Sequence, residues 1–68
     1  MFKELFRAEC SSRDYKNVTA AIKAATGKDD FLGFEEAEEP EKEFQKAIRA
    51  GFIEFAPGVV IVNADLGE

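Results

Sequence analysis

Carboxylates are the side chains of this chain that could do chemistry. Eight of its fourteen acidic residues lie between Asp29 and Glu43. General acid catalysis needs a buried carboxyl group with a raised pKa, whereas a run this dense is expected to be solvated. A calcium loop needs an aspartate-rich register and a downstream bidentate glutamate, which Asp29 to Gly33 does not provide. The plainer interpretation is a solvated helix N-terminus, and the functional one is a patch for a basic protein, formed by Glu35, Glu36, Glu38, Glu39, Glu41 and Glu43.

Nucleophiles and metal ligands are scarce. The chain has a single cysteine, Cys10, and no histidine. It therefore has no Cys–His or Ser–His pair, no Cys/His zinc site and no intrachain disulfide, and Cys10 is expected to act as a small apolar residue. Gly27-Lys28 lacks the upstream glycine and the following Ser or Thr of a phosphate loop. The sequence predicts a protein that is not an enzyme and takes no metal or cofactor.

Three basic residues form a second candidate surface. Arg13, Lys16 and Lys23 fall opposite the apolar stripe of a predicted helix and would share its solvent face. Such a stripe could contact phosphates, although it is more often a solvated face. Charge is unevenly divided: Met1 to Lys28 holds six basic and three acidic residues, and Asp29 to Glu68 holds three basic and eleven acidic ones.

Helices are expected to position these groups in the first part of the chain. Phe2, Leu5 and Phe6 stand at i, i+3 and i+4, which predicts a short amphipathic helix up to Cys10. An S-x-x-D pattern from Ser11 then precedes a second helix at about 12–26, which ends at a glycine.

The acidic segment and a third helix follow. Residues 28–39 have no clean period and are expected to be irregular, with three large apolar side chains sealing one end of the core. Pro40 at a first helical position and basic residues near the end predict a helix over 40–50. Gly51, followed by apolar residues, is typical of a Schellman stop. The three sealing residues are Phe31, Leu32 and Phe34.

Two strands are predicted after this helix. They flank Pro57-Gly58, which suits a type II turn, so a loop of three to five residues is expected in place of a tight turn. The second strand is apolar on both faces, whereas a hairpin on one helical layer should alternate. A domain of 68 residues is marginally stable alone, and oligomerisation is one remedy. The excess apolar face therefore predicts a homodimer surface at Val59, Val60, Ile61 and Val62.

The predicted fold is one α+β domain over residues 1–68. It has two N-terminal helices, an irregular acidic segment, a third helix, and a C-terminal β-hairpin packed on the helices. No apolar run approaches the roughly 18 residues of a membrane span, and the first residues lack a signal-peptide pattern. We expect a cytoplasmic protein, located in the host cytoplasm if a phage encodes it.

Three helices followed by a hairpin is also the order of winged-helix proteins and small phage repressors. The stretch FQKAIRAG, Phe44 to Gly51, resembles the Cro-type repressors, and this resemblance implies a DNA-binding regulator as an alternative. The start of that helix carries glutamates, however, which DNA phosphates would repel. The connection over 27–39 is also longer than a helix-turn-helix turn. Nucleic acid is therefore not the expected partner.

The net charge of −5 and the absence of catalytic pairs favour a protein-binding role. We expect a non-enzymatic acidic module, forming a homodimer, that modulates or inhibits a larger basic or nucleic-acid-binding protein, as small phage-encoded proteins do. A structural or accessory subunit of an assembly such as a phage particle is the alternative. In that case the basic half of one copy would meet the acidic half of the next.

Overall fold

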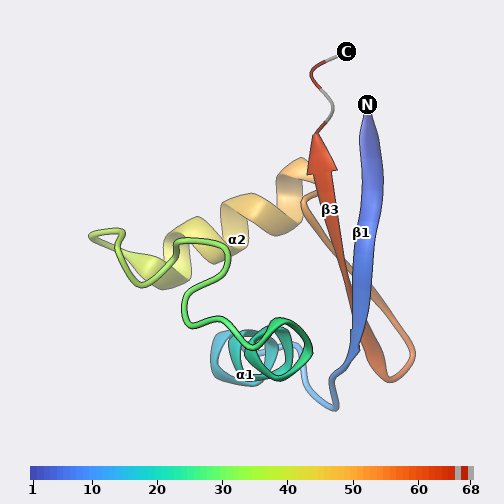
Figure 1. Ribbon diagram of the computed structural model, residues 1–68. Coiled ribbons are helices and arrows are strands. Elements are labelled where there is room, and N and C mark those ends of the chain that lie inside the picture. The colour runs from blue at the N-terminus through green and yellow to red at the C-terminus, as the bar shows by residue number, and fades with distance from the viewer. Residues whose placement is uncertain (66, 68) are drawn as a thin grey trace.

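A three-stranded sheet carries two helices in the computed structural model, which describes residues 1–65 and 67. The chain runs through β1 (Phe2–Glu9), α1 (Tyr15–Thr26), α2 (Pro40–Ala50), β2 (Ile53–Ala56) and β3 (Val59–Asp65). The strands are antiparallel in the order β1-β3-β2, and both helices lie on one face of the sheet (Figure 1). The chain is α+β overall, but the predicted arrangement of three helices and a separate hairpin is wrong.

The first predicted helix is the strand β1. Phe2, Leu5 and Phe6 have helical spacing, but a β-bulge between Glu4 and Phe6 gives a strand the same spacing. The extra residue shifts the alternation, so that Phe6 and Ala8 both pack on the core while Leu5 stays exposed. Seven paired positions with β3 outweigh the local helical pattern, because strand preference depends on cross-strand and same-face packing.

The helix α1 is confirmed, with a later start. It begins at Tyr15, and its N-cap is Asp14, the last residue of the predicted S-x-x-D pattern, rather than Ser11. Ser12 donates its hydroxyl to the Asp14 carboxylate, and the Asn17 amide donates to the same group at 3.0 Å. These bonds hold the turn that redirects the chain from β1 onto the face of the sheet.

The helix α2 has the predicted bounds and the predicted ending. Gly51 has φ 101° and donates its N–H to the carbonyls of Ala47 and Ile48, and Phe52 donates to Ala47 at 3.0 Å. This is the Schellman pattern, in which the left-handed residue terminates the helix. The chain then turns directly into β2.

The turn between β2 and β3 is tighter than predicted. Ala56 pairs with Val59, so Pro57 and Gly58 alone form the connection, and the expected longer loop is wrong. Gly58 has φ 75°, as the second central residue of a type II turn requires. The Cys10 N–H donates to the Gly58 carbonyl at 3.0 Å, so the end of β1 holds a turn that an isolated hairpin would disfavour.

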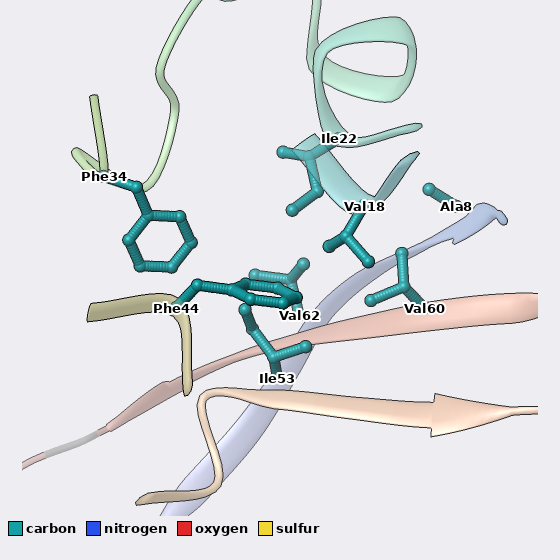
Figure 2. Close-up of a cluster of buried hydrophobic side chains, with 8 residues drawn as sticks. All are labelled: Ala8, Val18, Ile22, Phe34, Phe44, Ile53, Val60 and Val62. Atoms are coloured by element: carbon teal, nitrogen blue, oxygen red, sulfur yellow. The ribbon is translucent and has the colours of Figure 1, made fainter. Parts of the chain in front are cut away.

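The core lies between the sheet and the helices. Phe44 at 1% exposure, and Val18 and Val60 at 0%, lie at its centre. Figure 2 shows side chains from both helices, all three strands and the connecting segment pointing toward one another. The cluster comprises Ala8, Val18, Ile22, Phe34, Phe44, Ile53, Val60 and Val62.

The central position of β3 accounts for its apolar sequence. Val60 and Val62 face the helices and are fully buried, while Ile61, on the other face, is 9% exposed and lies between Arg7 and Glu54 on the neighbouring strands. A strand flanked on both sides is shielded by its neighbours even on the open face of a sheet. The second apolar face is thus largely covered within one chain.

Candidate functional site

The acidic segment between α1 and α2 is irregular, as predicted, but it is ordered by its own backbone bonds. Asp30 adopts φ 48°, in the left-handed region. Its carbonyl accepts the Gly33 N–H at 3.0 Å, and its carboxylate accepts the Glu35 N–H at 2.9 Å. Asp30 thereby closes the turn that precedes the glutamates, and its carboxylate is bonded to the backbone of the same segment.

Aromatic packing fixes this segment to the core. Phe34 is 7% exposed, and its ring centroid lies 5.9 Å from that of Phe44 and 6.2 Å from that of Tyr15. Leu32 also packs against the core, so the predicted seal is confirmed for these two residues. Phe31 is 37% exposed, and its ring makes an edge-on contact with that of Phe6, at 5.6 Å between centroids.

The six glutamates of the predicted patch share one stretch of surface, which we call the acidic surface. Two ion pairs lie within it, Glu39 with Lys42 at 3.5 Å and Glu43 with Lys46 at 3.2 Å. Exposed pairs of this kind contribute little, and two lysines leave the surface strongly negative. Its members are Glu35, Glu36, Glu38, Glu39 and Glu41, which are exposed, and Glu43, which is half-buried.

A cleft of about 340 Å³ lies between α1 and the acidic segment. Tyr15 and Lys23 line it from the helix, and Asp29 and Glu35 line it from the segment. Burial raises the pKa of Tyr15, and the charges of Glu35, Asp30 and Glu41 raise it further, in that order. The phenol is therefore neutral at physiological pH and can donate a hydrogen bond toward the acidic surface.

Only two of the three basic residues share the predicted face: Lys16 and Lys23 line the same cleft, whereas Arg13 does not belong to the helix. Arg13 lies before α1 begins, and its guanidinium stands over the Phe55 ring at 5.2 Å from the centroid. Lys23, near the other end of α1, pairs with Asp29 at 2.7 Å, and this hydrogen bond and charge raise its pKa. Lys16 is exposed between them at the cleft. Two of the three cations thus have partners within the chain.

The predicted self-association residues lie in the centre of the sheet. Val60 and Val62 are 0% exposed and Ile61 is 9% exposed. Val59 alone among the four is half-buried. These side chains offer little surface to another chain.

The remaining candidate groups for chemistry lie apart from the acidic surface or are engaged within the chain. The Cys10 thiol is half-buried and donates to the Ser12 carbonyl at 2.7 Å. Within residues 1–65 and 67, no three His, Cys, Asp or Glu side chains are placed to hold a metal ion. A dense negative surface beside a neutral phenol is suited to a cationic ligand.

Two features of this surface were not predicted. One is the position of Tyr15 at the cleft beside the acidic segment, which nothing in the sequence indicated. The open edge of β1 was also missed, because the residues were assigned to a helix. The alternating residues of Arg7-Ala8-Glu9, charged, small and charged, were a usable signal for a strand.

No family model, curated protein or solved structure matches the chain. Over the described part of the chain, neither helix has the length and apolar character needed to cross a membrane.

Proposed function

We propose that this protein is a non-enzymatic protein-binding module whose acidic surface engages a basic partner. Among such partners, a nucleic-acid-binding or regulatory surface on a larger protein fits best. A nucleic-acid-binding surface carries basic side chains that pair with phosphates, and the glutamates could pair with the same side chains. In this role the module acts as a modulator or inhibitor. The proposal includes self-association into a homodimer, since a domain this small gains stability from a second copy.

The observation that carries the proposal is the exposure of the glutamates on an anchored segment. Phe34 fixes the segment to the core, while five of the six glutamates stand in solvent. Neighbouring carboxylates repel one another, and a fold does not require six of them in nine positions. A rigid like-charged surface accelerates encounter with an oppositely charged partner and loses that advantage as salt is added.

Charge reversal tests the proposal. Glu36→Lys with Glu38→Lys should weaken capture of basic proteins from the native host, because it inverts the centre of the acidic surface. For an identified partner, the association rate should fall and its dependence on salt should flatten. Affinity capture followed by mass spectrometry and then surface plasmon resonance at several salt concentrations would measure both.

The matched control lies elsewhere on the molecule. Glu54→Lys changes the formal charge as much as Glu38→Lys does, but Glu54 is an exposed residue of β2. Its reversal should leave the association rate close to that of the wild type. Equal losses for the two single reversals would contradict a localised acidic site.

The DNA-binding alternative loses its architectural basis. It required three helices before a hairpin, and the described chain has β1 in place of the first helix. Arg13 and Lys23 are also engaged by Phe55 and Asp29. A gel shift at low salt with duplex DNA is expected to detect no binding.

A further inference from the structure

The strand β1 forms one edge of the sheet and leaves part of its backbone without a neighbour in the described chain. The Cys10 N–H donates to Gly58 at 3.0 Å, in line with the register that pairs β1 with β3. Antiparallel strands bond to each neighbour through alternate residues, so Cys10 and Ala8 bond toward β3. The N–H and C=O groups of Arg7 and Glu9 therefore point to the open edge.

The other side of β3 agrees with this alternation. The Asn63 N–H donates to Phe52 of the chain entering β2 at 2.8 Å. Odd-numbered residues of β3 thus bond toward β2 and even-numbered residues toward β1. The hydrogen bonds on both sides of β3 therefore agree that the backbone groups of Arg7 and Glu9 point to the open edge.

Only half of this edge is suited to pairing. The bulge at Leu5 interrupts the first half, and bulges keep an edge from pairing with another chain. The second half, residues 6–10, is regular. An unpaired regular edge strand is a template for another strand. Because backbone pairing is not specific, the side chains of β1 must determine which strand pairs with it.

We propose that this half of β1 pairs with the same half of a second copy, antiparallel about a two-fold axis at Ala8, to give one continuous sheet. The inference rests on the self-association in the proposed function and assigns its surface. Two-fold symmetry requires the axis to pass where one residue faces its own copy. An axis at Arg7 or at Glu9 places like charges opposite one another. An axis at Ala8 instead places each Arg7 opposite Glu9 of the second copy.

The remaining positions in this register are also complementary. Ala8 faces its own copy and is small enough to be accommodated at the axis. Phe6 faces Cys10 of the second copy, and both pack on the core side of the sheet. Among the described residues, Arg7 is paired with Glu4 alone, at 2.9 and 3.1 Å, on an exposed surface. It can therefore reach across to a second carboxylate at little cost.

Charge reversal followed by mixing tests this register. Arg7→Glu and Glu9→Arg should each weaken the dimer about tenfold, because two attractive cross-strand pairs become repulsive. An equimolar mixture of the two variants should regain wild-type association, since the mixed dimer restores both pairs. The double variant should also dimerise. Sedimentation equilibrium from low micromolar to near-millimolar concentration measures each constant.

Two further variants separate pairing from folding. Glu4→Gln, like Arg7→Glu, removes the ion pair between residues 4 and 7, but it leaves the proposed pairs between the two copies intact. Its dimer dissociation constant should therefore match that of the wild type. Glu9→Pro deletes an N–H that points to the open edge and costs no bond to β3, so it should give a folded monomer. Circular dichroism confirms the fold in each case.

The outcomes distinguish this surface from the proposed function. A wild type that stays monomeric to near-millimolar concentration overturns the self-association, while binding through the acidic surface is judged separately by the Glu36 and Glu38 reversals. A wild-type dimer that is insensitive to Arg7→Glu, or that mixing does not restore, overturns the β1 surface and leaves the dimer itself intact.

Discussion

At the scale of single residues, Tyr15 joins the core to the acidic surface. Its ring centroid lies 5.5 Å from that of Phe44, in an edge-on contact, and it lines the cleft together with Glu35 and Asp30. Aromatic contacts of this kind stabilise beyond the area they bury. A change in the ionisation of Tyr15 therefore affects both the stability of the fold and the charge beside the acidic surface.

Tyr15 makes stability depend on alkaline pH. Its folded pKa is raised above the ordinary 10.0 by burial and by nearby carboxylates, so the folded state favours the neutral phenol. The contribution to stability is complete below pH 10.0 and is lost as pH rises through the folded pKa. Urea denaturation at increasing pH should show this loss, and Tyr15→Phe should remove it.

The titration can be followed directly. The chain has one tyrosine and no tryptophan, so the ultraviolet absorbance of phenolate reports Tyr15 alone. Glu35→Gln should lower the midpoint, because it removes the largest of the carboxylate contributions. A wild-type midpoint at or below that of the urea-unfolded chain would contradict the burial of this phenol.

At the scale of elements, the sequence predicted those helices and strands that are determined by residues close together in the chain. The bounds of α2 follow from Pro40 and Gly51. The existence of the hairpin follows from strand-forming residues around Pro57, but its turn is tighter than predicted and β3 continues past Val62 to Asp65. The acidic surface was found from composition alone. β1 was predicted wrongly, because its bulge imitates helical spacing and its pairing with β3 joins residues far apart in the chain. The alternation at Arg7-Ala8-Glu9 was a local signal for the strand, but it covers only three residues. The open edge could not be located without that pairing.

The junction of α2 and β2 gives a prediction about backbone strain. Gly51→Ala should cost at least about 1 kcal/mol, because alanine disfavours a positive φ. The new Cβ would also lie 3.1 Å from the Phe2 ring. Chemical denaturation measures the loss.

Gly27→Ala is the matched comparison. Gly27 also ends a helix, at φ 71°, but a Cβ there meets no atom within 4 Å. It should lose stability from the backbone alone and therefore less than Gly51→Ala. The difference should shrink in a Phe2→Ala background, and equal losses at the two glycines in both backgrounds would refute the contact with Phe2.

At the scale of the whole molecule, repulsion among the carboxylates of the acidic surface affects stability. The radius of gyration is 11.2 Å, close to the Debye length of about 10 Å at 0.1 M salt. Every carboxylate of the acidic surface therefore feels the others at low ionic strength. The surface that we propose for a basic partner is at the same time unfavourable for the fold.

Salt should accordingly move stability and binding in opposite directions. Raising sodium chloride toward molar concentration should increase Tm by roughly 2 to 4 °C, as a gain of about half a kcal/mol does in a small domain, while it weakens binding to a basic partner. Differential scanning calorimetry measures the first effect. The double variant Glu36→Lys with Glu38→Lys takes the formal charge from −5 to −1, so salt should raise its Tm less. A Tm of the wild type that falls with added salt would contradict repulsion within the acidic surface.

The place of β3 in the chain also bears on how the protein folds during synthesis. β1 pairs only with β3, and all the other elements lie between them in sequence. A ribosome therefore releases β1 long before its neighbour exists, and each helix emerges before the central strand that completes its core. Such long-range pairing is slow and leaves apolar surface exposed meanwhile. The core cannot close until Val62 has left the exit tunnel, and until then Phe44 is accessible to a chaperone.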